Sequence, residues 1–371
     1  MTIQKSLQII GFAICAILIQ SQLFAQYKFK EDYQAKATKV KNQQRTGTCW
    51  SFSTTSFLES ELIRMGKGKH DLSEMFVVRK VYEDKAYNYV LRQGKANFSQ
   101  GSLSHDLINA VSKHGIVPES VYMGRSKAEI AHNHTEMEAV LKGMLDALVT
   151  QRSVSKKWKT AFNSILDTYL GSTSAQFSQK DKSYTPKTYA KELGLEASNY
   201  ISISSFSHHQ FYSPFILEVP DNFSNGSFYN VPLNEMESIL DDALKAGYTI
   251  SLDTDVSENG FSAKEGLAIL PVEFDEEKSF RNPQKELAVT QSNRQEGFES
   301  FATTDDHLMH ITGIAHDQAG TKYYIVKNSW GEISDYKGYL YMSANYFRMK
   351  AISIMLHKDA LSDEVSKKLS L

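Results

Sequence analysis

Cysteine is scarce in this sequence. The 371 residues include only two, Cys15 and Cys49. Cys15 lies in an N-terminal stretch that we expect to be removed, so the mature protein would hold one thiol and no internal disulfide. In an exported protein an unpaired thiol is open to oxidation and mispairing, which favours a reactive role for Cys49. The alternative is a small buried apolar side chain, the commoner fate of free cysteines.

The sequence also lacks a large net charge and long apolar runs. The formal net charge is −2, which gives no reason to expect nucleic acid or an acidic membrane as a partner. Residues 1–25 combine Lys5, an apolar run over 7–19 and a final Ala25, the form of a secretory signal peptide. The run is too short to span a bilayer comfortably. We therefore expect an exported protein, periplasmic or extracellular, without a membrane contact once the leader is cleaved.

Motifs for cofactors and metals are missing as well. There is no glycine-rich phosphate loop, internal repeat or low-complexity segment. The pair His208-His209 is the one hint of a metal site. Neighbouring side chains of a strand face opposite ways, and no cysteine or spaced acid cluster completes a ligand set. We expect neither a metal nor a cofactor.

The stretch around Cys49 carries the strongest signal. Residues 50–65 have apolar side chains near a 3.6-residue period, which predicts a helix directly after Cys49. Gly47 permits a tight turn before that helix. A thiol at a helix N-terminus faces the positive end of the helix dipole, which favours the thiolate. Gln43 lies six residues upstream and is a candidate donor to an oxyanion.

This stretch, with Gln, five residues and then Cys-Trp-Ser-Phe, resembles the nucleophile segment of papain-like cysteine peptidases. Thr46 stands where that family usually has a further cysteine, so a disulfide partner is missing while the chemistry is untouched. Asn42-Gln43 followed by residues 47–50 is most similar to the bleomycin hydrolase (aminopeptidase C) branch.

Two later stretches extend the resemblance. His307 comes six residues before Gly313 in a predicted strand, the spacing of the family's catalytic histidine. His310 lacks this spacing and points to the opposite strand face, so we expect a structural role for it. Residues 328–331, Asn-Ser-Trp-Gly, follow an apolar strand and are similar to the family's third signature.

The resemblance implies a role for each residue. Cys49 would be the nucleophile, paired as thiolate with the imidazolium of His307, and Asn328 would orient that ring. Gln43 and the backbone N–H of Cys49 would bind the oxyanion. Trp330 would shield the His–Asn contact and offer a wall to the leaving group.

Substrate binding is expected at a loop further along the chain. Gly101-Ser102 of this sequence is similar to the family's Gly-Gly pair, whose backbone groups contact the substrate. We expect the backbone contact to be kept and the rim of the pocket to be slightly narrowed by the serine side chain. On the loop's own evidence it is equally an ordinary surface turn.

The order of the elements predicts an α+β fold with a cleft between two lobes, and the resemblance specifies a papain-like one, with a helical N-terminal lobe, a helical insertion and an antiparallel β lobe. The expected helices cover residues 50–65, 72–92, 104–114, parts of 126–171 with apolar positions from Ile130 to Leu148, 185–193 and 234–246. The expected strands cover residues 201–204, 215–219, 248–252, 309–315, 323–327, 339–342 and 351–357. Residues 26–42 are expected to be extended and 171–182 and 273–300 to be loops. The domains are predicted as 1–25 (leader), 26–200 (helical lobe), 201–357 (β-rich lobe) and 358–371 (tail).

The predicted function is peptide hydrolysis without a cofactor. In the bleomycin hydrolase branch the chain's own C-terminus lies in the cleft, and the polar tail 358–371 is long enough to reach back; it is equally a short surface helix. We therefore favour an aminopeptidase over an endopeptidase. A catalytically silent binding protein on the same fold is the further alternative, although Cys49, His307 and Asn328 are all present. The resemblance also suggests a homo-oligomer, and the insertion would either supply subunit contacts or only enlarge the core.

Overall fold

The structure, a computed structural model, describes residues 27–126 and 130–371, so the predicted leader lies outside the described residues. The helices are α2 (Cys49–Arg64), α3 (Glu74–Leu91), α4 (Ser104–His114), α5 (Thr135–Val149), α6 (Lys157–Leu170), α7 (Pro186–Leu193), α8 (Leu233–Lys245), α9 (Glu276–Ser279), α10 (Gln291–Glu299), α11 (Ala344–Lys350) and α12 (Asp363–Lys368). The strands are β1 (Lys30–Gln34), β2 (Phe177–Gln179), β3 (Lys182–Tyr184), β4 (Tyr200–Ser204), β5 (Pro214–Ile216), β6 (Ser227–Asn230), β7 (Ile250–Thr254), β8 (Phe261–Ser262), β9 (Leu267–Ala268), β10 (His307–His316), β11 (Lys322–Lys327), β12 (Tyr339–Ser343) and β13 (Ala351–His357). Across the described part of the chain, none of these helices has the length and apolarity that a bilayer crossing requires.

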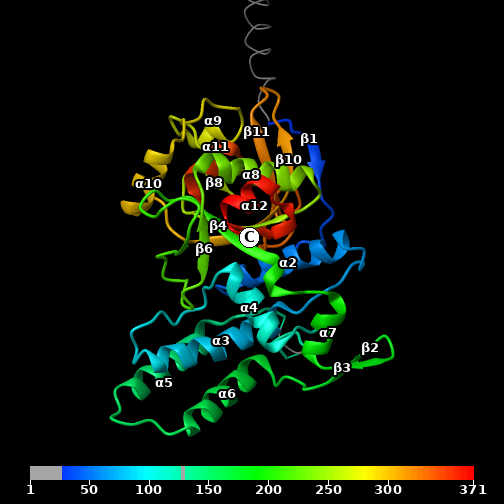
Figure 1. The fold of residues 1–371 in the computed structure, drawn as a ribbon, viewed down its shortest axis with the longest axis vertical. Coiled ribbons are helices and arrows are strands. Elements are labelled where there is room, and N and C mark those ends of the chain that lie inside the picture. The colour runs from blue at the N-terminus through cyan, green and yellow to red at the C-terminus, as the bar shows by residue number, and fades with distance from the viewer. Residues whose placement is uncertain (1–26, 127–129) are drawn as a thin grey trace, which may run out of the picture.

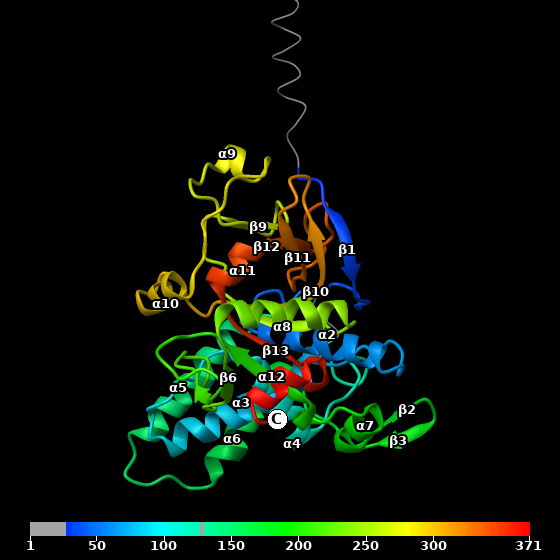
Figure 2. The ribbon, with the colours of Figure 1, turned by 45° about the horizontal axis from the view of Figure 1, so that its top comes forward.

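The molecule has a helical part and a sheet part, with α2 between them. Figures 1 and 2 show α3 to α7 at one end and the sheet with α8, α9 and α11 at the other. The main sheet has the order β5-β6-β4-β13-β7-β10-β11-β12-β9-β8, and β1 pairs with β10. The fold is therefore α+β, as the sequence predicted.

The two faces of the sheet pack against different helices. Met309 and Ile311 of β10 lie in one core with the apolar residues of α8. Leu308 of the same strand belongs to the other core, with α2, and His310 contacts α2 through Nδ1, 2.9 Å from Oγ of Ser56. Strand alternation thus separates the α2 face, where Cys49 lies, from the α8 face.

The helical insertion consists of α5 and α6 joined by a loop, and α6 matches the second helix expected at about 155–170. Met137 and Phe162 are buried in the core that also contains Cys49. Two positions expected on the apolar face of the insertion are not buried. Val140 is 42% exposed, and Ile130, which precedes α5, is 92% exposed. The insertion therefore enlarges the core, while a role in subunit contacts stays a prediction.

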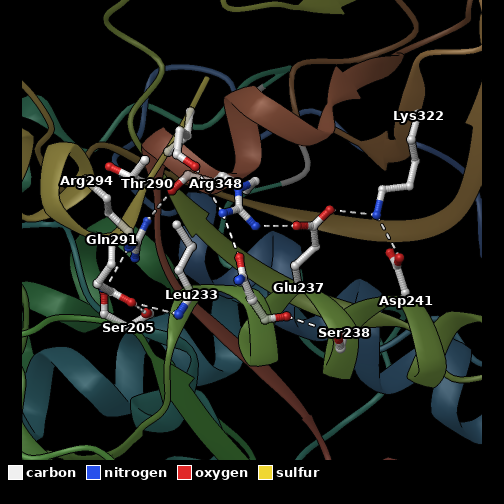
Figure 3. Close-up of polar contacts among 12 residues, drawn as sticks. Ser205, Leu233, Glu237, Ser238, Asp241, Thr290, Gln291, Arg294, Lys322 and Arg348 are labelled. Atoms are coloured by element: carbon white, nitrogen blue, oxygen red, sulfur yellow. Dashed lines mark hydrogen bonds and ion pairs between the residues drawn. The ribbon is translucent and has the colours of Figure 1, made fainter. Parts of the chain in front are cut away.

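The segment 273–300 was predicted as a loop, and this was wrong, because it contains α9 and α10. Arg294 of α10 is buried; its Nε donates to the carbonyl oxygen of Ser205 at 2.8 Å and its Nη1 to that of Arg348 at 3.0 Å. Arg348 in turn forms an ion pair with Glu237 of α8 at 2.6 Å. Figure 3 shows this network joining α8, α10 and α11. These partners are distant in sequence, so local composition could not reveal them.

Six short strands were also missed, namely β6, β8, β9 and the three described next, β1, β2 and β3. Within residues 26–42, β1 pairs antiparallel with β10, with Lys30 opposite His316. Within residues 171–184, β2 and β3 form a two-stranded hairpin. Each of these three is three to five residues long, too short to show a clear alternating pattern.

The C-terminal tail does not lie in the cleft, so the hypothesis that its carboxylate holds the substrate is wrong. It forms the short helix α12, which lies beside α8 (Figures 1 and 2). Val365 and Leu369 are buried in the core on the α8 face, opposite the face that holds α2. The N–H of Leu371 returns to the carbonyl oxygen of Ser366 at 3.0 Å, so the chain end folds back on α12.

Deletion of residues 358–371 is accordingly expected to lower stability and leave substrate specificity unchanged. Loss of Val365 and Leu369 from the core removes about 1.5–3 kcal/mol of burial free energy for each. Urea unfolding of the full and truncated chains measures this difference. Appearance of endopeptidase activity in the truncated protein would contradict the placement of the tail on α8.

Candidate functional site

Cys49 is the first residue of α2 and is 8% exposed. The loop that precedes it is held by Gln100, whose Oε1 accepts from the N–H of Gly47 at 2.7 Å. A Cβ at position 47 would lie 2.9 Å from Cβ of Gln100, so only glycine allows this close approach. The indole N–H of Trp50 donates to the carbonyl oxygen of Gln100 at 2.9 Å. These bonds place the thiol at the helix N-terminus, as the sequence predicted.

His307 begins β10 and is oriented by the loop after β11. Its Nε2 lies 2.8 Å from Oδ1 of Asn328. The N–H of Ser329 donates to the same Oδ1 at 2.7 Å, so this oxygen is an acceptor and Nε2 of His307 carries the proton. The tautomer leaves Nδ1 free to act as a base. The ring of Trp330 lies over that of His307, with centroids 4.6 Å apart, and shields the pair from water.

The thiol of Cys49 contacts the strand residue that follows His307. The backbone N–H of Leu308, the residue after His307, donates to the sulfur of Cys49. Burial, with the negative charges of Asp305 and Asp221, raises the pKa of the Cys49 thiol to about 12. Burial also lowers the pKa of His307 to about 4, despite the bond to Asn328. Both shifts oppose the thiolate–imidazolium pair that the resemblance implies, and this pair stays a prediction.

The raised pKa of the Cys49 thiol predicts how its alkylation depends on pH. The reactive thiolate becomes more abundant as pH rises toward the raised pKa. The rate constant for inactivation by iodoacetamide should therefore increase by about tenfold per pH unit from pH 5 to 9. A preformed ion pair would instead give a plateau over this range. The labelling reaction is quenched at set times and the labelled fraction of Cys49 is measured by mass spectrometry at each pH. A plateau in the rate constant would contradict the raised pKa of the Cys49 thiol.

Gln43 is buried next to the same loop. Its Oε1 accepts from Oγ of Ser329 at 2.6 Å, and its Nε2 donates to the carbonyl oxygen of Thr46 at 2.7 Å. One amide N–H is thereby used, and the second is left for another acceptor. The bridge fixes the amide relative to Asn328. Its role as oxyanion donor stays a prediction.

The expected narrowing of the pocket rim by Ser102 was wrong. Ser102 is buried, and its Oγ donates to Oδ2 of Asp106 at 2.8 Å, so its side chain supports the start of α4 rather than the cleft. The carbonyl oxygen of Gly101 accepts from Nζ of Lys85, which also donates to the carbonyl oxygen of Ser99 at 3.1 Å. The carbonyl oxygen of Gly101 therefore already has a hydrogen-bond donor, which limits its predicted contact with a substrate.

The histidine pair is arranged differently from the expectation. His208 and His209 lie in a turn, not a strand, and both contact the carboxylate of Glu218, at 3.2 and 2.6 Å. Oε1 of Gln295 accepts from the N–H of Ser207, so its Nε2 donates to Nδ1 of His208 at 2.8 Å. Nε2 of His208 then carries a proton directed at Glu218, which opposes metal ligation by this atom.

Two acidic residues whose charges act on the thiol, Asp221 and Asp305, were not found from the sequence. Asp221 lies in a turn, and no local motif marks it. Asp305 lies two residues before His307, and this proximity was the only available signal.

Comparison with known proteins identifies the family. The description "Peptidase C1-like family" belongs to the family model that matches residues 80–371, a stretch that includes His307 and Asn328. Aminopeptidase G of Lactobacillus delbrueckii subsp. lactis is 26% identical, covering 89% of this chain and 83% of that protein. Human bleomycin hydrolase is 22% identical, covering 92% and 85%.

A solved structure is similar over the same extent. The crystal structure of pepw from Lactobacillus rhamnosis HN001 (DR20) superposes with a TM-score of 0.71 at 19% identity, covering 92% of this chain and 84% of that chain. This likeness concerns the fold. The family match over most of the sequence, together with these relatives, shows that the chain belongs to the Peptidase C1-like family and is a cysteine-type peptidase.

Proposed function

We propose that this protein is a cysteine aminopeptidase in which Cys49 is the nucleophile, His307 the base and Asn328 the residue that orients the base. The observation that carries the proposal is the 2.8 Å contact between His307 and Asn328, beside a thiol at the start of α2. The relatives named aminopeptidase G and bleomycin hydrolase support a peptide substrate. No cofactor takes part in this chemistry.

In the proposed mechanism Nδ1 of His307 takes the proton of the Cys49 thiol as the sulfur attacks the peptide carbonyl. A C–S bond forms, and the oxyanion is bound by the free N–H of Gln43 and the backbone N–H of Cys49. The imidazolium then returns its proton to the leaving amine as the C–N bond breaks. Water activated by His307 hydrolyses the thioester and releases the acid and the thiol.

An exopeptidase is favoured over an endopeptidase by the loop at Gly101. An endopeptidase substrate continues on the N-terminal side of the residue whose carbonyl is attacked. That extended part of the peptide would use backbone groups of this loop. The ammonium of Lys85 already occupies the carbonyl oxygen of Gly101, which weakens that contact. Trp330 remains the proposed wall of the leaving-group side.

The test is labelling with an epoxide inhibitor of papain-like peptidases, followed by location of the adduct by mass spectrometry. An adduct on Cys49 that is lost in His307→Ala and kept in His310→Ala is expected. Hydrolysis of unblocked aminoacyl amides, without cleavage of N-acetylated peptides, would identify the exopeptidase. Absence of an adduct on the folded protein would favour the silent binding protein instead.

We also propose that the protein is exported, to the periplasm or the extracellular space. Expression of the whole chain in a secreting host should yield a mature protein that begins at Gln26, because residues 1–25 have the form of a cleaved leader. Intact-mass analysis and N-terminal sequencing measure this. Retention of the protein in the cytoplasm, or an uncleaved chain, would contradict the proposal. A homo-oligomer is part of the same proposal, and light scattering of the mature protein tests it.

A further inference from the structure

The loop that leads to the thiol, residues 44–48, is not held by a disulfide. Cys49 is free, and Thr46 stands where the family usually has a further cysteine. Gln44 has a φ of 60°, a left-handed conformation that a residue other than glycine keeps only where its surroundings enforce it. Other contacts must therefore fix this loop, and two groups of them come from the helical insertion.

The first group of contacts is made by residues 132–134, which lead into α5. The N–H of Arg45 donates to the carbonyl oxygen of His132 at 3.2 Å, and the N–H of His134 donates to the carbonyl oxygen of Arg45 at 3.2 Å. Arg45 and Asn133 thereby form a parallel bridge. Oε1 of Gln44 also accepts from the N–H of His132. The insertion is thus bonded to the backbone of the loop just before the thiol.

The second contact runs through Gln100 to Glu138, which lies in the first turn of α5. Oε2 of Glu138 accepts from Nε2 of Gln100 at 2.7 Å, and Oε1 of Gln100 accepts from the N–H of Gly47 at 2.7 Å. A backbone N–H can only donate and a carboxylate can only accept, so these two partners fix the orientation of the amide. The carbonyl oxygen of Gln100 accepts from the indole of Trp50. This set of bonds from Glu138 through Gln100 to Gly47, the Gln100 clasp, therefore joins α5 to the chain on both sides of Cys49.

The Gln100 clasp is supported by buried structure at both ends. Met137, the neighbour of Glu138, is fully buried in the core on the α2 face. Helix α5 packs against α3, and Nζ of Lys85 on α3 donates to the carbonyl oxygens of residues 99 and 101, on either side of Gln100. The carboxylate and the amide are thus held in place before a substrate binds.

We propose that the helical insertion positions the nucleophile, and that Glu138 is the positioning residue through which it acts. Gly47 and Cys49 are two residues apart, so a shift of the loop moves both the sulfur and the backbone N–H that would bind the oxyanion. Displacement of a reacting group by about 1 Å can reduce the rate about 10²-fold. The inference rests on the proposed function, in which Cys49 attacks the substrate. It gives the insertion a part in the reaction in addition to its part in the core.

Removal of the Glu138 carboxylate tests this role. Glu138→Ala should lower kcat for an aminoacyl fluorogenic amide by about 10- to 100-fold and leave KM within a few-fold, because the nucleophile is displaced while the groups that bind the substrate are unchanged. Glu138→Gln keeps a side-chain oxygen that accepts from Nε2 of Gln100. It should therefore restore kcat to within a few-fold of that of the original protein.

Glu136 provides the matched control, since it is the other acidic residue in the first turn of α5. Its Oε1 accepts from the hydroxyl of Tyr169 on α6 at 2.9 Å. Glu136→Ala removes the same charge from the same helical turn and should leave kcat unchanged. Gln100→Ala breaks the Gln100 clasp independently, and adding Glu138→Ala to it should cause no further loss, because the two residues act through one hydrogen bond.

These variants also distinguish a failure of the clasp from a failure of the proposed function. Unchanged kcat in Glu138→Ala, no recovery in Glu138→Gln, an equal loss in Glu136→Ala, or losses that multiply in the double variant would overturn the positioning role. Hydrogen exchange at the amide of Gly47 requires no catalysis and should be about tenfold faster in Glu138→Ala. Unchanged exchange would overturn the Gln100 clasp itself. Faster exchange in a protein without Cys49-dependent hydrolysis would reject the proposed function and keep the clasp.

Discussion

Replacement of His307 by alanine should reduce kcat by about 10⁶-fold, the scale seen when a nucleophile's base is removed from a catalytic triad. Nδ1 of His307 is the base left free by the bond between Nε2 and Asn328. Because the thiol has a raised pKa, sulfur attack without a base would require a rare thiolate. Hydrolysis of an aminoacyl fluorogenic amide measures the effect.

His310 provides the matched control, since it is an equally buried histidine of the same strand. Its Nδ1 bonds to Ser56, and Oγ of Ser56 also accepts from Lys327 at 2.7 Å. His310→Ala should therefore lower the free energy of unfolding while kcat per folded molecule stays within a few-fold of that of the original protein. A loss of kcat in His310→Ala as large as in His307→Ala would reject the assignment of the base.

Replacement of Gln43 by alanine should lower kcat by about 10²–10³-fold, or about 2.7–4 kcal/mol of transition-state stabilisation, the usual effect of one oxyanion donor. The amide is rigidly held by Thr46 and Ser329, so its remaining N–H is aimed before substrate binds. A preorganised donor needs no rearrangement during the reaction, which is why its loss appears in kcat rather than in KM.

Gln43→Glu distinguishes the donor from the structural bridge. Glutamate keeps an acceptor for Oγ of Ser329 but has no N–H for the oxyanion or for the carbonyl oxygen of Thr46. It should be at least as inactive per folded molecule as Gln43→Ala, with a lower thermal midpoint than the original protein, because a buried carboxylate then faces the carbonyl oxygen of Thr46. An unchanged rate in both variants would remove Gln43 from the oxyanion site.

The sequence by itself was sufficient for the elements with strong local signals. The 3.6-residue period after Cys49 predicted α2. The next helix, α3, begins after Ser73, a residue type that favours N-caps, and its Oγ accepts from the N–H of Phe76 at 3.0 Å. The resemblance of His307 and residues 328–331 to the family's motifs implied a contact between His307 and Asn328, whose Nε2 and Oδ1 lie 2.8 Å apart. These signals are visible because capping and periodicity act over a few residues.

What only the tertiary structure decided depends on contacts between distant residues. Arg294 is buried against Ser205 and Arg348, so a charged stretch becomes a packed helix. Leu369 inserts into the α8 core, so a polar tail leaves the cleft. Burial and the charges of Asp305 and Asp221 raise the pKa of the Cys49 thiol and so oppose the thiolate that the helix position alone favours. Burial and Coulomb interactions act through space rather than along the chain, and for that reason the charge state of the site followed from the fold and not from the motif.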